Sequence, residues 1–342
     1  MDRQNATPLV GVVTPFYNTK DFLPECIESV LAQTYQNWEY VLVDNYSTDG
    51  SGDIARQYAS RFPNKIRVIQ PESFLDQIPN YNFGLASISR HSIYSKMVQA
   101  DDWLYPECLE QLVALAESDP EIGIVSSYRL KGKNVMGGGI PYTTSLMPGA
   151  EICCLQLSTG IFAFGTPTTM LYRSVLVSKN EPFFDKNSFY DDTDACYRLL
   201  GDWKFGFVHR VLSFSRVDDE SIRGQVEDFN PDILDRYLQL SRFGPVYLER
   251  EEFIRLRKQW RSRYYSFLGR GLVTGQSRAF WRYHRSGLES GGLELERLPL
   301  LGHACLELLK MLVNPGQTAT FIYRKFRSAV KANSKRHAKN SS

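Results

Sequence analysis

Short apolar segments alternate with segments of helical periodicity through the first 130 residues, and this alternation limits the chain to few folds. Residues 9–14 and 38–44 are nearly continuous apolar runs, as expected for strands buried on both faces of a sheet. Between them, Ile27, Val30 and Leu31 lie at i, i+3 and i+4 and predict a helix with one apolar face. Further strands are predicted at 66–69, 94–98 and 122–126. This repetition predicts an α/β fold, Rossmann-like, with a mainly parallel central sheet flanked by helices.

The rest of the chain gives weaker strand signals. Residues 131–165 are rich in Gly, Pro, Ser and Thr and are predicted to form a long irregular loop. Residues 183–200 are predicted to end in a helix, and residues 203–208 and 212–217 to form two short strands. Beyond residue 225 helical patterns dominate, so we expect a mostly helical C-terminal extension.

Composition is that of a globular protein with an uneven charge distribution. The 342 residues are 43% apolar and 23% charged, which excludes a disordered, collagen-like or disulfide-scaffold chain. Residues 1–250 hold 22 Lys and Arg against 32 Asp and Glu, whereas residues 251–342 hold 18 against 6. The two parts therefore carry opposite net charges, and we expect them to meet different partners.

The N-terminal residues and the cysteines indicate a compartment. The first residues lack the pattern of a secretory signal, and no apolar run is long enough to span a bilayer. The six cysteines show neither CxxC pairs nor metal-ligand spacing with histidine. We therefore expect reduced, buried thiols and a cytoplasmic protein.

Polar residues follow three of the predicted strands at the point where each strand ends. They are Thr14–Asn18, Asp44–Gly50 and Gln99–Asp102. Ligands of open parallel sheets bind beyond the carboxyl ends of the strands. The sequence therefore predicts a binding site at this edge of the sheet.

Four segments resemble, in order, the motifs of the family 2 glycosyltransferases: VGVVTPFYN, SVLAQTYQNWEYVLVDNYSTDGS, QADDW and FYDDTDACYRLL. The resemblance covers roughly residues 8–220 and is most specific between Gln33 and Asp49. It implies a GT-A fold, a nucleotide-sugar-binding catalytic domain that we expect over residues 1–224. It also implies an inverting hexosyl- or N-acetylhexosaminyl-type transferase. Such an enzyme moves a sugar from a nucleotide-diphosphate donor, here expected to be UDP-linked, to a hydroxyl of a glycan or lipid-linked acceptor in cell-surface polysaccharide or glycoconjugate synthesis.

The resemblance places the nucleotide at the first two strand ends. It implies that Asp44 accepts a hydrogen bond from uracil, and that Thr14, Pro15 and Tyr17 frame the same pocket. Taken alone, Asp44 is more typical of an Asx turn or helix cap in the Ser-Thr-Asp-Gly loop, and the surrounding motifs favour the nucleotide contact. Asn82 falls in a segment that resembles the region near the diphosphate, with a helix start as the alternative.

Asp101 and Asp102 match the family region that binds Mn²⁺ or Mg²⁺. The resemblance assigns Asp102 to the ion and Asp101 to the ribose or to a position beside the metal ligand. Such an ion neutralises charge on the leaving diphosphate. The alternative is that both residues cap the helix predicted from Pro106. Many relatives carry a further Asp where this chain has Gln99.

Asp191 and Asp192 match an acidic pair that begins a helix. In the family the second carboxylate is the usual general base, so Asp192 is expected to take the acceptor proton, with Asp191 as the alternative base. An ordinary carboxyl pKa of ~3.9 must rise for that role, and the neighbouring Asp194 adds negative charge. The alternative is helix N-terminal charge, which stabilises a helix by roughly 0.3–1 kcal/mol per acid.

Two departures from the family pattern keep other functions open. Gln99 replaces an acid, and Asp218 stands where relatives often carry a histidine that closes over the diphosphate, which leaves Arg216 and Arg223 to meet phosphate. The alternative is a non-catalytic nucleotide-sugar-binding or membrane scaffold protein of the same fold. A nucleotidyltransferase is a third and weaker hypothesis.

The C-terminal third resembles no motif. We expect a helical region over 225–320 that faces the acceptor or a membrane, and a basic, disordered segment over 321–342. Its basic and aromatic residues are more typical of packed helices than of a nucleic-acid site, so nucleic acid is not an expected partner. The apolar segment 298–313 followed by seven Lys and Arg and no acid predicts peripheral binding to an anionic membrane surface. A buried packing helix is an equally good interpretation.

Overall fold

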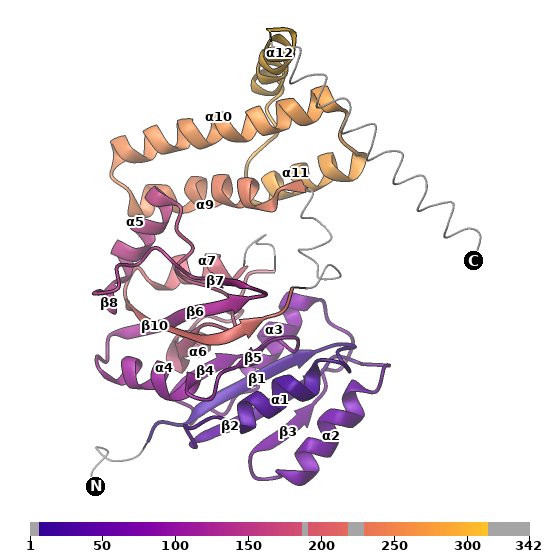
Figure 1. Ribbon diagram of the computed structural model, residues 1–342, viewed down its shortest axis with the longest axis vertical. Coiled ribbons are helices and arrows are strands. Elements are labelled where there is room, and N and C mark those ends of the chain that lie inside the picture. The colour runs from indigo at the N-terminus through magenta and orange to yellow at the C-terminus, as the bar shows by residue number, and fades with distance from the viewer. Residues whose placement is uncertain (1–6, 187–190, 218–228, 314–342) are drawn as a thin grey trace, which may run out of the picture. The chain divides into compact units, whose positions relative to one another are not determined.

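A computed structural model of the chain describes residues 7–186, 191–217 and 229–313. The described residues form two compact units, Met1–Phe253 and Ile254–Ser342. The first unit is built on a ten-stranded sheet in the order β3-β2-β1-β4-β9-β6-β10-β5, with β7 paired to β6 and β8 to β10 (Figure 1). The strands are β1 Val10–Phe16, β2 Trp38–Asp44, β3 Ile66–Ile69, β4 Tyr94–Met97, β5 Trp103–Leu104, β6 Ile122–Lys131, β7 Asn134–Met136, β8 Leu146–Pro148, β9 Leu171–Arg173 and β10 Lys204–Ser215.

The sheet is mainly parallel, as predicted. Strands β3, β2, β1 and β4 pair in parallel, and β9 pairs antiparallel with both β4 and β6. Strand β6 therefore runs in the same direction as β4, and β10 pairs in parallel with β6. The short strands β5, β7, β8 and β9 are the antiparallel members. The carboxyl ends of the long strands consequently lie along one edge.

Helices cover both faces of this sheet. Those of the first unit are α1 Leu23–Leu31, α2 Ser51–Arg61, α3 Gln77–Ala86, α4 Cys108–Glu117, α5 Gly149–Thr159, α6 Ser174–Lys179, α7 Asp191–Leu199 and α9 Pro231–Tyr247. Helices α1 and α4 bury their apolar stripes in one core cluster with alternate residues of β1 and β2. Helix α3 lies on the opposite face, where Gly84 permits a close approach: a Cβ there would lie 2.9 Å from Val13.

Two expectations for residues 131–217 were wrong. Residues 131–165 are not one irregular loop, because they contain β7, β8 and α5. The two strands predicted at 203–208 and 212–217 are one strand, β10, which pairs with β6 through register shifts between Val208 and Val211 and between Val211 and Ser213. The irregular register explains why the apolar pattern breaks into two runs.

Helix α9 packs within the first unit. Its Tyr247 hydroxyl donates to the Tyr197 carbonyl, and the rings of Phe243 and Tyr197 stack with centroids 4.7 Å apart. The second unit contains most of α10 (Arg250–Thr274), α11 (Arg278–Ser290) and α12 (Arg297–Val313). The domain limits predicted at residues 224 and 320 remain predictions, and the segment 321–342 lies outside the described residues.

The second unit is held by aromatic and small residues of α10. Tyr264 packs against α11, where its hydroxyl lies 3.1 Å from Nδ1 of the buried His284. A Cβ added at Gly269 of α10 would lie 2.8 Å from the Ala304 nitrogen of α12, so the two helices come close there. None of the described helices has the length and hydropathy needed to cross a bilayer.

Gly149 marks the tightest backbone approach around α5. A Cβ at this position would lie 2.0 Å from the Leu200 carbonyl oxygen and 2.2 Å from that of Trp203. We expect Gly149→Ala to lower the free energy of unfolding by about 1–3 kcal/mol, because backbone rather than a flexible side chain must move. Urea denaturation measures the change. Gly138→Ala is the control, since no atom lies within 4 Å of its Cβ; equal losses in the two variants would contradict the packing argument.

Candidate active site

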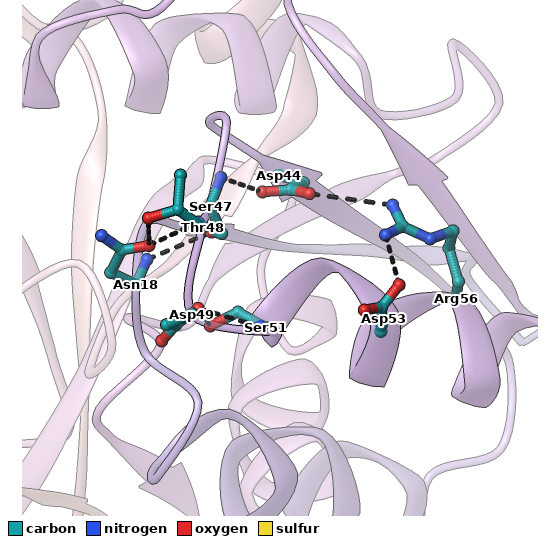
Figure 2. Close-up of polar contacts among 8 residues, drawn as sticks. All are labelled: Asn18, Asp44, Ser47, Thr48, Asp49, Ser51, Asp53 and Arg56. Carbon is teal, nitrogen blue, oxygen red and sulfur yellow. Dashed lines mark hydrogen bonds and ion pairs between the residues drawn. The ribbon is translucent and has the colours of Figure 1, made fainter.

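Asp44 ends β2 and lies buried at the carboxyl edge of the sheet. Its Oδ1 accepts a hydrogen bond from the Ser47 nitrogen at 2.9 Å, and its Oδ2 lies 3.9 Å from Nη1 of Arg56 (Figure 2). A Cβ at Gly52 would lie 2.3 Å from that Oδ2, so glycine makes room for the carboxylate. A local side-chain turn of the kind expected as an alternative is therefore present, and it reaches the third residue after Asp44. It occupies Oδ1, while Oδ2 faces a cation at the longer distance.

The loops that follow β1 and β2 are joined by side-chain hydrogen bonds. Asn18 Oδ1 accepts from the Thr48 nitrogen at 2.8 Å, and the Asn18 nitrogen donates to Ser47 Oγ at 3.1 Å (Figure 2). Asp49 Oδ1 accepts from the backbone nitrogen and hydroxyl of Ser51 at the start of α2. These bonds order the polar edge next to Asp44.

The residues predicted to frame the nucleotide pocket lie in different environments. Thr14 is fully buried, and its hydroxyl lies 2.8 Å from the Tyr40 hydroxyl inside the core. Pro15 is paired with Val43 in the sheet. Tyr17 is 45% exposed and contacts Phe74 edge to face. Of these side chains, Tyr17 is the one that is open to a ligand, and the three nucleotide contacts remain predictions.

Asp102 is buried directly before β5, which pairs with the end of β10. Its Oδ2 accepts from Ser215 Oγ at 3.2 Å, and its Oδ1 accepts from the Arg216 nitrogen at 3.3 Å. Burial, and next the charge of Asp101, raise the pKa of Asp102 to about 7. Asp101 itself is only half-buried. The two adjacent carboxylates thus differ: one holds two strands together, and the other is more open to a ligand.

The assignment of a metal site to Asp101 and Asp102 depends on further ligands that the donor diphosphate would supply. The described residues contain no group of three or more His, Cys, Asp or Glu that could hold an ion. Mg²⁺ in nucleotide enzymes is usually bound by one or two carboxylates together with substrate phosphates and waters. Asp101 and Asp102 are oxygen donors of that kind, so the residues present fit an ion that binds together with a diphosphate.

Tyr81 of α3 connects the two acidic clusters and was missed in the sequence. Its hydroxyl accepts from Gln99 Nε2 at 3.0 Å and from Gln77 Nε2 at 2.8 Å. Burial raises the pKa of Tyr81 far above its ordinary value, and the charges of Asp191 and Asp101 both add to the rise. Both carboxylates therefore lie close enough to Tyr81 to act on it electrostatically.

A second missed residue is Lys96, a lone cation within the apolar strand β4. It is fully buried, and its ammonium donates to the carbonyls of Thr168 and Met170. Burial lowers the pKa of Lys96 to about 8, while the neighbouring charge of Asp102 opposes the fall. A lysine inside an otherwise apolar strand is the sequence signal that could have found it.

Asp191, Asp192 and Asp194 all lie in the first turn of α7. Burial raises the pKa of Asp191 to about 8, and the charge of Asp192 contributes next. Asp192 Oδ1 accepts from the Thr193 nitrogen at 2.6 Å, and Asp194 forms an ion pair with Arg242 of α9. The three acids therefore lie at a helix N-terminus, as the alternative interpretation expects, and the pKa of Asp191 is raised in addition.

Asn82 fastens α3 to the segment that leads into α7. Its Nδ2 donates to the Phe184 carbonyl at 2.8 Å, and its Oδ1 accepts from the Phe184 nitrogen at 2.8 Å. Both polar atoms of the amide are therefore used in positioning this segment. The predicted contact of Asn82 with the donor remains a prediction.

Arg216 follows β10 and lies next to Asp101 and Asp102. Its guanidinium lies 4.5 Å from the centroid of the Phe22 ring and pairs with Glu25 at 2.6 Å. Its Nε donates to the Asp101 carbonyl at 3.4 Å. Asp218 and Arg223, which the sequence placed in the same segment, lie outside the described residues.

The polar edge, the paired acids and the strand order agree with the motif order in the sequence. Residues 11–178 match the family model described as glycosyl transferase family 2. This segment belongs to the family 2 glycosyltransferases. Among curated proteins, glycosyltransferase GlyG of Streptococcus pneumoniae serotype 4 is 30% identical over 203 residues, which are 56% of this chain and 64% of GlyG. The chain spans less than two thirds of the length of the first curated relatives that it matches.

Solved structures show the same fold at low identity. TarS 1-349 of S. aureus in complex with UDP-GlcNAc superposes with a TM-score of 0.58 at 17% identity, over 82% of this chain and 80% of that 1-349 chain. The mannosyltransferase PcManGT of Pyrobaculum calidifontis, with GDP-Man and Mn²⁺, gives a TM-score of 0.54 at 14% identity, over 93% of this chain and 84% of that one. The predicted GT-A fold with a helical C-terminal region is confirmed.

The raised pKa of Asp191 predicts a pH dependence of stability. Because the folded pKa of about 8 exceeds the ordinary 3.8, the unfolded chain loses this proton at a lower pH than the folded chain does. The free energy of unfolding therefore falls as pH rises from about 4 to 8. We expect the advantage of Asp191→Asn over the wild type in free energy of unfolding to be smaller at pH 5 than at pH 9. Asp21→Asn, at an exposed carboxylate, is the control. A constant difference between Asp191→Asn and wild type at both pH values would contradict the assignment.

Proposed function

We propose that this family member transfers a hexosyl or N-acetylhexosaminyl group from a UDP-sugar to an acceptor hydroxyl with inversion. The observation that carries the proposal is the position of Tyr81. Its hydroxyl accepts from Gln99, two residues before Asp101, and its ring contacts Phe184, which precedes α7 in the sequence. A donor diphosphate at the first carboxylate would present its sugar to the second cluster. The structural relative TarS was solved with UDP-GlcNAc, which supports the UDP-linked donor.

The donor nucleotide is proposed to lie over the ends of β1 and β2. Asp44 would accept from the base through Oδ2, the oxygen not used in the turn, and Tyr17 would contact the same base. Thr14 and Pro15 would support the pocket from the core side. Asn82 would act near the diphosphate by positioning the segment before α7.

A divalent ion, Mn²⁺ or Mg²⁺, is proposed to accompany the donor. Asp101 is the more open carboxylate and would meet the ion and the ribose, and Asp102 would support it from the buried position between the start of β5 and the end of β10. This refines the expectation that Asp102 alone is the metal ligand. The ion would neutralise charge that grows on the leaving diphosphate. PcManGT was solved with Mn²⁺, which supports the class of cofactor.

Asp192 is proposed as the general base and Asp191 as its partner. The acceptor O–H gives its proton to the Asp192 carboxylate while the oxygen forms a bond to the anomeric carbon. The bond from that carbon to the diphosphate oxygen breaks, and the electron pair leaves with the nucleoside diphosphate. Burial keeps the proton on Asp191 near neutral pH, so the negative charge of the pair resides on Asp192.

Release of nucleoside diphosphate tests this proposal. With a panel of nucleotide sugars and Mn²⁺, we expect the wild type to release UDP from a UDP-sugar and to stop when EDTA is added. Asp192→Asn should lower turnover by at least about 100-fold, as expected for loss of a positioned base, with UDP affinity retained. Asp191→Asn should reduce turnover less.

The outcomes separate the competing functions. UDP binding without turnover for any donor would favour the non-catalytic binder, and release of pyrophosphate would favour a nucleotidyltransferase. A larger loss in Asp191→Asn than in Asp192→Asn would move the base to Asp191. Normal turnover in both variants would contradict the base assignment altogether.

The acceptor is proposed to be a glycan or lipid-linked hydroxyl at the cytoplasmic face of an anionic membrane. The supporting feature is the apolar surface of α12. Within this helix, Ala304 and Glu307 are the buried residues. Seven aliphatic residues are at least half exposed: Leu298 at 85%, Leu301 at 54%, Leu306 at 52%, Leu308 at 50%, Leu309 at 56%, Leu312 at 77% and Val313 at 85%. Such a helix followed by a basic sequence suits an interfacial position.

Liposome flotation of the full chain tests the membrane proposal. We expect binding to vesicles that contain anionic lipid and little binding to phosphatidylcholine alone. The double variant Leu308→Gln/Leu312→Gln should bind at least about tenfold more weakly, because each buried leucine contributes about 1.5–3 kcal/mol. Val135→Gln/Val246→Gln, at exposed positions of the first unit, is the control. Equal binding of wild type and α12 variant, or equal binding to both vesicle types, would contradict the proposal.

A further inference from the structure

An ion pair joins α9 to the helix that carries the proposed base. Arg242 of α9 pairs through Nη1 with Oδ2 of Asp194, in the first turn of α7. The Asp194 side chain is 8% exposed, so this carboxylate is nearly buried, whereas the Arg242 side chain is 42% exposed. Both helices follow the segment 11–178 that matches the family model, and Arg242 is outside every motif identified in the sequence.

Further contacts hold Arg242 beside α7. The ring of Phe243 stacks on that of Tyr197 with centroids 4.7 Å apart, and the Tyr247 hydroxyl donates to the Tyr197 carbonyl. The Arg242 guanidinium lies 5.2 Å from the centroid of the Phe243 ring. The packing of α9 on α7 therefore fixes the cation next to Asp194, unlike an ion pair between two flexible surface side chains.

The acids of the first turn of α7 disfavour one another's ionisation. Burial is the main cause of the raised pKa of Asp191, and the charges of Asp192 and Asp194 add to it. An opposite charge close to a carboxylate favours its ionised form. The cation bound to Asp194 therefore offsets one of the three negative charges. Without it, Asp194 adds an uncompensated charge beside the proposed base.

Other ionisable groups surround the same turn. In the part of the chain that the structure describes they include Tyr81 of α3, Cys153 of α5, Tyr172 of β9, and Cys196 and Arg198 of α7. Burial raises the pKa of both tyrosines and both thiols, so these groups are neutral near pH 7. Arg198 donates to the Phe183 carbonyl, whereas Arg242 binds a carboxylate of the turn itself.

We propose that Arg242 is a positioning residue for the acids of α7: its ion pair with Asp194 orients the first turn and offsets one of its three negative charges. Proton transfer is thereby confined to Asp191 and Asp192. This rests on the proposed function, since it concerns the same base. Arg242 acts through Asp194 rather than on the substrates, so its loss lowers kcat and leaves the KM for the donor unchanged.

The pH dependence of kcat, measured as release of UDP from a UDP-sugar by the full chain, tests this role. Arg242→Gln leaves the charge of Asp194 uncompensated. The pH of half-maximal kcat on the acid side should therefore rise by about one unit, and kcat below that pH should fall by about tenfold. Asp194→Asn leaves the cation uncompensated instead, so the same pH should fall.

The double variant Asp194→Asn/Arg242→Gln removes both charges. Its pH of half-maximal kcat should return to within about 0.3 unit of the wild type, because the two single shifts have opposite signs and one origin. Arg242→Lys keeps a cation that can reach the single paired oxygen, and its kcat should stay within about twofold of the wild type.

Arg236→Gln is the matched control on the same helix. Arg236 donates to the Gln156 carbonyl of α5 at 2.7 Å, so its loss weakens the packing of α9 without removing the cation from Asp194. Its pH of half-maximal kcat should equal that of the wild type. A shift in this control as large as in Arg242→Gln would show that loss of packing, and not of charge, is responsible.

The signs of the shifts separate the two proposals. An unshifted Arg242→Gln, shifts of the same sign in both single variants, or a change in donor KM in place of kcat would overturn the role of Arg242 and leave the transferase proposal intact. A wild-type chain that releases no UDP from any UDP-sugar would overturn both. Thermal melting shows which variants fold. If Arg242→Gln does not, Asp194→Asn decides, and an unchanged or raised pH of half-maximal kcat in that variant overturns the role.

Discussion

Parallel pairing of β1 with β2 and β4 is the constraint on which the candidate site depends. In this register Phe16 lies opposite Asp44, and Val13 lies opposite Met97. The three strands therefore end at nearby positions on the same edge, and the polar residues that follow them are brought together. A shift of one residue in either pairing would turn every side chain of the shifted strand to the other face of the sheet. The apolar residues that fill the core thus also fix the acids at the edge.

The carboxyl edge of the sheet contains several acidic side chains, and burial makes ionisation of two of them unfavourable. Burial raises the pKa values of Asp102 and Asp191, so both carboxylates are destabilised in their ionised form. Lys96 is buried in β4, and Arg216 lies beside Asp101. The cations are bound to carbonyls and to Glu25 and do not remove the excess of acid. A divalent cation that came with a diphosphate donor would stabilise the ionised carboxylates, which is the physical reason to expect metal dependence.

Local pattern was sufficient to predict the strands with strong apolar runs. The limits of β2 and β3 agree with the structure because both segments are short, apolar and bounded by polar turns. Strand β8 and helix α5 could not be predicted from a Gly-rich segment, because both depend on long-range contacts: β8 pairs with β10, and α5 begins against the backbone at Leu200 and Trp203.

The candidate site was predictable where a motif carries the residue. The motifs pointed to Asp44, to Asp101 and Asp102, and to Asp191 and Asp192, and the roles of these acids remain predictions. Tyr81 was not identified, because it has no distinctive spacing. Its hydroxyl is held by two glutamine donors, of which Gln99 lies on another segment. Such roles arise from tertiary contacts and leave no local pattern.

The residues at the end of β2 both present the candidate ligand-binding carboxylate and hold the neighbouring loop in place. Asp44 presents a carboxylate oxygen, Asn45 pairs with the backbone of Leu75, and Tyr46 adopts a φ of 64° that non-glycine residues rarely take. That conformation costs free energy and persists only where surrounding contacts require it. The two bonds from the Tyr46 hydroxyl to the neighbouring loop are such contacts. The strain at Tyr46 is therefore coupled to the position of the loop after β3, and the same strand end that positions the acid also positions this loop.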